Sequence, residues 1–389
     1  MRSEHKYYLY DAITTLGIAA TFTSYAPFLL SIGLSFAEIS LLNAVFWLVA
    51  ILAELPTGML ADGKSRAWSL KMGCVCMTFG GLVYVFSFNF LSALIGESLI
   101  AIGMAFFSGA EQAWITDALT REGRDHERRH IFGTRALVHG LVVVIGGGLC
   151  TFIALSNVRL IWIPMIVLSP VAYVFIAKNM NGHGEAIHPM SEMEALRSSI
   201  ALLKRSRALV WVILAMVVSG GVVAFNHFWS PYFQSLVGTL GLSYVWAIIY
   251  TACALSGLWV RRIQIPQGSE ANLILVTLAL SGIGLLIPNI SSTLGISLIG
   301  SIIHEVGRGT FAPLVDSFVQ HRVESGYRAT FGSLQSFLCR IGLALTSLFL
   351  WMVLQTHAST PETILFVWSV CGVGIVMGVI LLYGIRPRS

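Results

Sequence analysis

Two stretches of this sequence decide how the chain is organised: residues 112–133, QAWITDALTREGRDHERRHIFG, and residues 311–332, FAPLVDSFVQHRVESGYRATFG. In both, an apolar run ends near an aspartate, Asp117 or Asp316, and a polar loop leads to an Arg-x-x-Phe-Gly that opens the next apolar run. The offset is the same throughout, 316 − 117 = 199. Because matched charges arise by chance less often than matched Leu or Ala, we interpret the stretches as copies of one repeat.

Apolar stretches of about 20 residues flank the repeat and recur along the whole chain, each long enough to cross a hydrocarbon core as a helix. The composition agrees, since 56% of the 389 residues are hydrophobic, 11% are charged and the mean hydropathy is +0.79. We therefore predict an all-α membrane protein rather than a soluble one. The twelve predicted transmembrane helices are residues 8–32, 37–60, 68–88, 91–117, 132–155, 158–177, 207–234, 242–260, 271–288, 292–317, 329–355 and 361–385.

The positive charges predict the orientation of these helices. With the N-terminus inside the cell, all of the 24 Lys and Arg except Arg135, Arg159, Arg308 and Arg340 fall on the cytoplasmic side. The positive-inside rule therefore supports the helix count and predicts cytoplasmic N- and C-termini (N-in/C-in). We expect a multi-pass protein of the inner, cytoplasmic membrane.

The repeat predicts two six-helix bundles, residues 1–178 and residues 207–389, joined by a polar linker at residues 179–206. In the linker, Ser191 and Glu194 form a capping pattern, and apolar residues follow at helical spacing. We expect an amphipathic helix on the inner membrane surface, whose simplest role is to tether the two bundles.

The loop between the second and third predicted helices, residues 58–66 (GMLADGKSR), has a glycine, an aspartate four residues on, and then basic residues. This pattern resembles the loop signature of the major facilitator superfamily, with Ser65 in place of its second glycine. The twelve helices, the long central loop and the repeat extend the resemblance over the whole chain. The resemblance implies two pseudo-symmetric bundles and a secondary transporter that works by alternating access. Residues 108–117 (SGAEQAWITD) further resemble a bacterial branch that contains drug and siderophore exporters.

The same loop predicts a cytoplasmic gate. Asp62 can accept hydrogen bonds from the positive N-terminus of a neighbouring helix. Arg66, one turn on, is placed to bridge Asp62 to Asp117. By resemblance, such a cluster latches the two halves in the outward-open state, and we assign Gly58 and Glu54 to the same gate. Ordinary juxtamembrane charge, worth about 0 to 1 kcal/mol, is the alternative.

Ionisable residues inside the predicted helices are the second group of candidates, because each costs about 2.5 to 3.5 kcal/mol at a helix centre. The tenth helix carries His304, Glu305 and Arg308, at spacings that allow pairing along one side of the helix. We expect this trio to handle substrate or protons, and a structural ion pair is the alternative. It is not a zinc site, because a second histidine is missing and arginine does not ligate metal.

The fourth predicted helix carries two further candidates, Glu97 and Glu111. In a straight helix they lie on one face about 21 Å apart. We expect them to load and release protons as access alternates. Arg135 and Arg340 are possible partners that would instead hold them charged. Asp11, by contrast, we interpret as ordinary charge near the inner end of the first helix.

Three residues are candidate substrate contacts because the resemblance places their helices around the central cavity: Tyr25, Asn226 and His227. Packing between helices, or a place in the aromatic belts, is the alternative. Outside these groups, Ser35 and Glu38 form a pattern that predicts a helix start.

The two halves differ at the positions that the offset relates. The second half has Arg261 where the first has Asp62, and the first half has no charge opposite His304 and Glu305. We therefore expect the first half to hold the gate and the second half to contribute most of the central charge.

Other classes of function find little support in the sequence. The six cysteines all fall in apolar stretches, which predicts neither disulfides nor a metal site, and the net charge of +5 is dispersed, which does not indicate nucleic acid. No nucleophile–base pair supports an enzyme. We expect a monomeric transporter in the lipid bilayer, without cofactor or metal, that exports a small organic solute by proton coupling. Proton-coupled uptake of a metabolite or siderophore is the alternative, and a membrane sensor or enzyme on the same scaffold is a third.

Overall fold

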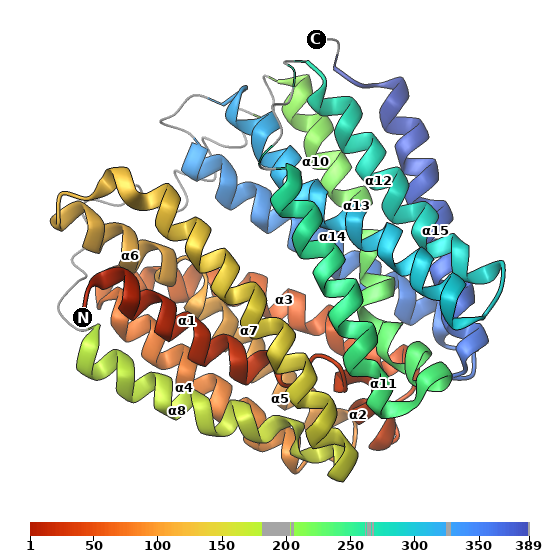
Figure 1. The fold of residues 1–389 in the computed structure, drawn as a ribbon, viewed down its shortest axis with the longest axis horizontal. Helices are drawn as coiled ribbons and strands as arrows, with labels where there is room; N and C mark the ends of the chain where they lie inside the picture. The colour runs from red at the N-terminus through yellow and green to blue at the C-terminus, as the bar shows by residue number, and fades with distance from the viewer. Residues whose placement is uncertain are drawn as a thin grey trace. The chain divides into compact units, whose positions relative to one another are not determined.

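The structure is a computed structural model that describes residues 1–180, 203, 206–260, 262, 266, 268–323 and 328–387, without the side chains of Leu55, Asp62, Arg328, Ala329, Thr330 and Ser333. The regular structure of these residues is helical throughout, with no strand (Figure 1). The all-α fold class is therefore confirmed for the described part of the chain. The predicted linker helix lies outside it, apart from Leu203.

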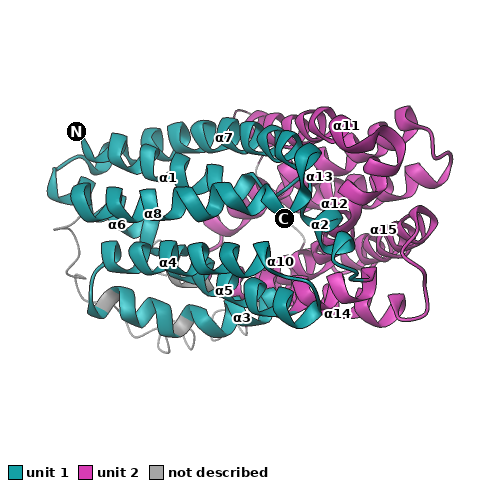
Figure 2. Cartoon of the chain, turned by 90° about the horizontal axis from the view of Figure 1, so that it is seen from below, with its two compact units in different colours: residues 1–34, 45–189 teal, residues 35–44, 190–389 magenta. Residues whose placement is uncertain are grey.

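The helices belong to two compact units, which Figure 2 colours separately: unit 1 comprises residues 1–34 and 45–189, and unit 2 comprises residues 35–44 and 190–389. Helix α3 (Phe36–Gly63) begins in unit 2 and continues in unit 1. The other helices of unit 1 are α1 (Ser3–Ala19), α2 (Tyr25–Ser31), α4 (Arg66–Val85), α5 (Phe90–Phe107), α6 (Ala110–Arg121), η1 (Asp125–Glu127), α7 (Arg128–Ser156), η2 (Val158–Trp162) and α8 (Ile163–Asn179). Those of unit 2 are α10 (Arg207–Ser219), η3 (Gly220–Val222), α11 (Val223–Val260), α12 (Glu270–Leu286), η4 (Ile287–Asn289), α13 (Leu294–Gln320), α14 (Arg328–Leu354) and α15 (Pro361–Gly384).

Nine segments of the described chain are long and apolar enough to cross a membrane, although each of the twelve predicted stretches falls on helix. The first stretch is divided between α1 and α2, and the charged residues of α13 lower its hydropathy. Residues 207–260 form one run of 54 residues. A straight helix of that length would extend about 81 Å, far more than a bilayer core, so the run has to turn back. It does so at Gly238, whose φ of 69° favours glycine. Twelve crossings and cytoplasmic termini stay predictions.

Helix starts follow the capping patterns of the sequence. The Ser35 backbone N–H and hydroxyl donate to Glu38 Oε2 at 2.8 and 2.9 Å, and the Glu38 N–H donates to Ser35 Oγ at 3.2 Å, which confirms the predicted start of α3. Ser65 caps α4, because its hydroxyl accepts from the Trp68 N–H at 3.1 Å. The serine that departs from the loop signature therefore has a structural role of its own.

Glycines allow the backbones of α12 and α13 to pack closely in unit 2. A Cβ added to Gly284 would meet the backbone of His304 and lie 2.6 Å from the Gly300 carbonyl oxygen. A Cβ on Gly307 would lie 2.5 Å from Ser281 Oγ. Small residues are common at such contacts because van der Waals packing, and not the exclusion of water, drives helix association in lipid. This contact sets the position of His304.

We expect Gly284→Ala to lower the melting temperature of the purified protein, because the added methyl group would collide with α13 and overpacking costs about 1–3 kcal/mol. Gly374→Ala in α15 is the control, since a Cβ at this position meets nothing within 4 Å and alanine is the better helix former. Thermal unfolding in detergent, followed by tryptophan fluorescence, compares the two variants. A melting temperature of Gly284→Ala at or above that of the control would contradict this packing.

Candidate functional site

Three charged side chains from different helices of unit 1 meet in one network: Asp11 in α1, Glu111 in α6 and Arg135 in α7. Arg135 donates to Asp11 Oδ1 from Nε at 2.9 Å and from Nη2 at 2.6 Å, and Nη2 also donates to Glu111 Oε1 at 3.0 Å. The side chain of Asp11 is 2% exposed, whereas those of Glu111 and Arg135 are 20% and 22% exposed. Two carboxylates therefore share one guanidinium, and the deeper one holds it by two hydrogen bonds.

A histidine extends this network. His139 Nδ1 lies 3.3 Å from both carboxylate oxygens of Asp11 and 3.1 Å from Thr15 Oγ1. It follows Arg135 by one turn of α7, and its side chain is 37% exposed. The network therefore places an imidazole ring beside its most buried carboxylate.

Two phenol groups of α1 lie beside the same network. Tyr7 and Tyr10 are both buried, and both interact electrostatically with Glu111 and Asp11. Within the described part of the chain, neither hydroxyl has a hydrogen-bond partner. Buried donors without an acceptor are rare in folded proteins, so these two hydroxyls call for an explanation.

Sequence reasoning found only part of this network. Arg135 was a possible partner of Glu111, and the structure joins them. Asp11, interpreted as ordinary charge near the inner end of the first helix, is the most buried member of the network, and His139 was not singled out. The available signal was that Asp11, Arg135 and His139 are ionisable and fall within apolar stretches. The expectation that the second half contributes most of the central charge stays a prediction.

Glu97 of α5 lies in different surroundings. Its carboxyl group is buried and accepts a hydrogen bond from the Tyr84 hydroxyl, and Tyr25 interacts with it as well. Tyr84 stacks on Trp162 with 3.9 Å between ring centroids and 4° between ring planes, and Tyr25 packs edge-on against both rings. No cation of the described residues pairs with Glu97. Aromatic rings and phenols thus surround a carboxyl group that has no counter-charge among the described residues.

The two carboxyl groups of the fourth predicted helix do not lie on one straight helix. α5 ends at Phe107 and α6 begins at Ala110, and Gly109 between them has a φ of 74°. The prediction that Glu97 and Glu111 share one face of a straight helix was therefore wrong. Glycine permits this break because other residues rarely adopt a positive φ.

In unit 2, two members of the α13 trio, Glu305 and Arg308, form an ion pair. The third member, His304, contacts the neighbouring helix α12 instead. Arg308 donates to Glu305 Oε2 from Nε at 2.8 Å and from Nη2 at 2.5 Å, as the three-residue spacing predicts. Glu305 is buried and Arg308 is partly exposed. His304 is fully buried, and its Nδ1 lies 2.8 Å from the Ser281 carbonyl oxygen of α12. Nδ1 must then carry a proton, while Nε2 has no partner among the described residues.

The remaining candidates of unit 2 lie in α11 and α14. His227 is buried, and its Nδ1 has no hydrogen-bond partner in the described part of the chain. Asn226, beside it, is exposed, and Arg340 in α14 is half-buried. Substrate contact by these residues stays a prediction.

The candidate gate residues belong to three helices of unit 1. α3 carries Glu54 and Gly58, α4 begins at Arg66, and α6 contains Asp117. The Ser108 hydroxyl donates to Glu54 Oε1 at 3.3 Å. The side chain of Asp62 lies outside the described residues, so the bridge through Arg66 to Asp117 stays a prediction.

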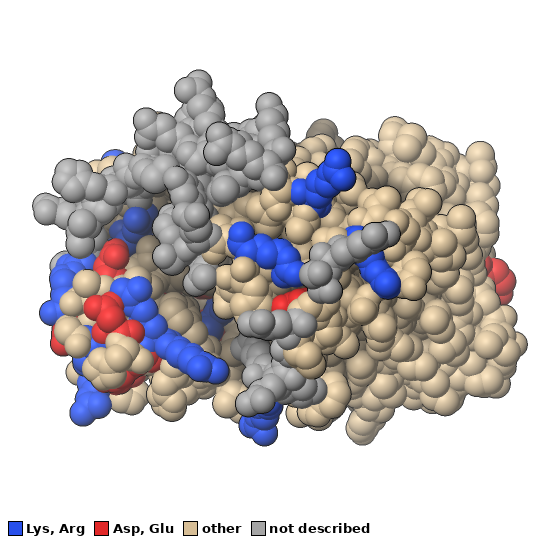
Figure 3. All heavy atoms as spheres, turned by 90° about the horizontal axis from the view of Figure 1, so that it is seen from above, with Lys and Arg blue, Asp and Glu red and all other residues tan. Residues whose placement is uncertain are grey.

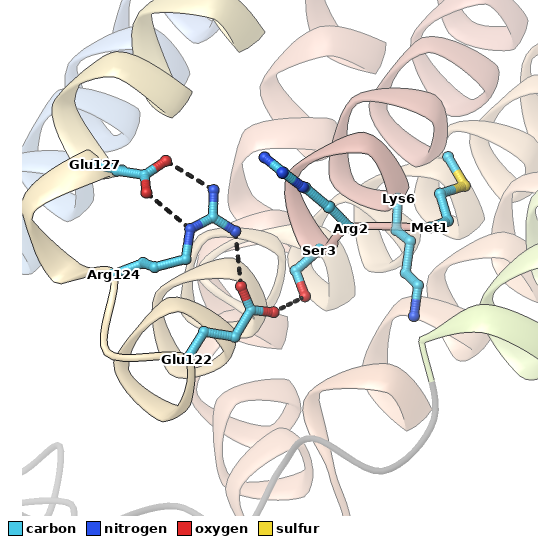
Figure 4. Close-up of a pocket in the computed structure, with 7 residues that line it drawn as sticks. All are labelled: Met1, Arg2, Ser3, Lys6, Glu122, Arg124 and Glu127. Carbon is cyan, nitrogen blue, oxygen red and sulfur yellow. Dashed lines mark hydrogen bonds and ion pairs between the residues drawn. The ribbon is translucent and has the colours of Figure 1, made fainter.

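Charged side chains gather at the left of the face drawn in Figure 3. In unit 1, an ion cluster joins the start of α1 to the turn between α6 and α7 (Figure 4). Arg124 donates to Glu127 at 2.7 and 2.8 Å, to Glu122 at 2.8 Å, and to both oxygens of Glu4 at 3.0 Å.

These contacts shift the pKa of two carboxyl groups. The Arg124 guanidinium lowers the pKa of Glu4. The pKa of Glu122 is lowered first by a hydrogen bond from Ser3 and then by Arg124. A pocket of about 610 Å³ lies beside this cluster, and it is lined by Met1, Arg2, Ser3, Lys6, Glu122, Arg124 and Glu127.

No group of three or more His, Cys, Asp and Glu within the described residues could hold a metal ion. The six cysteines are all free thiols.

Comparison with known proteins bears on the fold and the family. The family model described as Major Facilitator Superfamily matches residues 11–347, whereas no curated protein matches the sequence. The nucleoside transporter NupG is 14% identical with a TM-score of 0.80, over 99% of each chain. A POT family peptide transporter is 11% identical with a TM-score of 0.78, over 100% of this chain and 98% of that one. A bacterial homolog of the human lysosomal transporter Spinster is 13% identical with a TM-score of 0.68, over 99% and 95%. At these identities the likeness shows the fold alone.

The stability of the protein in acid should depend on Arg124. Because Arg124 lowers the pKa of Glu4, this pair stabilises the folded state above the unfolded pKa of about 4.5, and the contribution is lost as the pH falls through the folded pKa. Arg124→Gln should lower the melting temperature at pH 7 and flatten its fall between about pH 5 and pH 3.

Melting curves of the purified protein over this range test the expectation. Arg386→Gln is the control, because the recorded partners of Arg386, Asn272 and Tyr383, do not titrate in acid. Parallel curves for the wild type and Arg124→Gln would show that the cluster does not contribute.

Proposed function

The chain belongs to the Major Facilitator Superfamily, and on that premise we propose that it is a proton-coupled secondary transporter of a small organic solute. It works by alternating access, as a monomer in the inner membrane with both termini inside. The resemblance of residues 108–117 to exporters supports efflux as the direction. The family and the apolar helices make the chain a multi-pass membrane transporter, and the coupling ion and the direction are the proposed part.

The observation that carries proton coupling is the environment of Glu97. This carboxyl group is buried in a predicted transmembrane helix, receives a hydrogen bond from Tyr84 and has no cation partner among the described residues. An ionised carboxylate without a cation beside it is costly in such a site, so the neutral acid is favoured. A proton held in this way leaves only when water or a base reaches the group, which alternating access provides.

The other buried carboxyl groups of the predicted transmembrane helices, Asp11 and Glu305, are less suited to carry the proton. Asp11 is held by Arg135 through two hydrogen bonds, and Glu305 is held in the same way by Arg308. A paired guanidinium favours the ionised carboxylate. These groups are therefore better suited to fix helices or to bind charged solutes, and Glu97 to bind the proton.

Flux into proteoliposomes that contain only this protein tests the proposal. We would measure labelled uridine, glycylsarcosine and ethidium, with and without an imposed pH gradient. We expect at least one probe to accumulate only with the gradient, and the sign of the gradient gives the direction of coupling. Glu97→Gln should abolish gradient-driven accumulation because the amide cannot take up a proton, and Glu305→Gln tests the weaker candidate in the same assay.

Glu362→Gln is the matched control, because Glu362 is exposed at the start of α15. Its gradient-driven flux should equal that of the wild type. Full coupling in both Glu97→Gln and Glu305→Gln would refute these proton sites, and gradient-independent flux in the wild type would refute proton coupling itself.

For the gate, we expect Asp62→Asn and Arg66→Ala to slow flux about 5- to 150-fold while expression and melting temperature stay normal. The reason is that a latch biases the equilibrium between two conformations, and such biases are about 1–3 kcal/mol. Lys71→Gln, in the same helix as Arg66, is the control. Wild-type flux in both gate variants would reduce these residues to ordinary surface charge.

A further inference from the structure

We propose that Arg135 binds an acidic group of the transported solute, a carboxylate or a phosphate, and that Glu111 is the carboxyl group which the solute displaces. The inference rests on the proposed transport function and names the substrate class for it. It concerns the network of α1, α6 and α7 in unit 1, where Asp11, Glu111 and Arg135 meet.

Arg135 makes more hydrogen bonds to Asp11 than to Glu111, and this difference indicates which carboxylate a solute can displace. Asp11 is nearly inaccessible and accepts from Nε and Nη2, whereas Glu111 accepts from Nη2 alone and is partly exposed. Asp11 also has His139 beside it. Asp11 is therefore the fixed anchor of the guanidinium, and Glu111 is the partner that an incoming anion can replace.

The free edge of the guanidinium has the right form for an acidic group. The recorded hydrogen bonds of Arg135 use Nε and Nη2, and none of those in the described residues uses Nη1. When Glu111 moves away, Nη1 and Nη2 present two parallel N–H donors. A carboxylate or a phosphate accepts such a pair of donors through two oxygens, which is why arginine is common where these groups are recognised.

Two tyrosine hydroxyls without a partner among the described residues can donate hydrogen bonds to the displaced Glu111 carboxylate. Tyr7 and Tyr10 are buried, interact electrostatically with Glu111, and have hydroxyls without a partner in the described residues. A carboxylate is the acceptor that both hydroxyls lack. Two hydroxyls that already interact with Glu111 can thus donate hydrogen bonds to its carboxylate after displacement, so the carboxylate is not left without donors.

His139 completes the site as a second recognition group. It lies one turn from Arg135 and is the most exposed member of the network, and its recorded contacts all involve Nδ1. Nε2 is therefore available to the solute, as a donor when the ring is protonated. Arg135 and His139 together favour a solute with an acidic group over its neutral counterpart.

The test compares benzoate with benzamide, which differ in the acidic group, by thermal shift of the purified protein in detergent. We expect saturable stabilisation by benzoate and a smaller effect of benzamide. Glu111→Gln should tighten the apparent affinity for benzoate about tenfold, because the internal competitor loses its charge. Arg135→Gln should abolish the benzoate effect.

Arg159→Gln is the control, because Arg159 donates to the backbone carbonyls of Val85 and Ser87 and is not part of the network. Should Arg135→Gln fail to fold, the double variant Asp11→Asn with Arg135→Gln removes both charges as a pair and carries the same expectation. Equal effects of benzoate and benzamide on both the wild type and Glu111→Gln would overturn the inference, as would benzoate binding that survives Arg135→Gln. Neither result would affect the proton-gradient test of transport, so the two proposals fail separately.

Discussion

The structure depends on one constraint, that an ionised side chain inside a membrane costs about 2.5 to 3.5 kcal/mol or more unless it has a partner. Two groups of charged residues in the predicted spans follow it. Arg135 lies against Asp11 and Glu111, and Arg308 lies against Glu305. In unit 1, these pairs connect helices that are distant in sequence, so the same contacts that neutralise the charges also hold the helices in place.

The arrangements differ in how well their charges balance, and this difference carries the functional argument. Glu305 and Arg308 balance one to one. Asp11 and Glu111 exceed their single guanidinium by one negative charge, and Glu97 has phenols but no cation among the described residues. A balanced pair is stable in one arrangement. An unbalanced one changes when a proton or a charged solute arrives, and that is what a coupled transporter requires.

The sequence predicted those structural features that depend on residues close together in the chain. Apolar runs predicted the helices, the Ser35–Glu38 pattern predicted a helix start, and a spacing of three predicted the Glu305–Arg308 pair. It did not predict that Asp11 meets Arg135, because these residues are 124 positions apart and only the packing of α1 on α7 joins them. Nor did it predict the break at Gly109, since a glycine within an apolar run is compatible with a continuous helix.

The central claim is that Glu97 carries the coupling proton, and infrared difference spectroscopy tests it without knowledge of the solute. A protonated carboxyl group has a C=O stretching band that an ionised carboxylate lacks. Comparison of the wild type with Glu97→Gln at neutral pH should therefore reveal one protonated-carboxyl band that the variant has lost. If the variant instead loses only carboxylate bands, Glu97 is ionised at rest and the account of coupling is wrong.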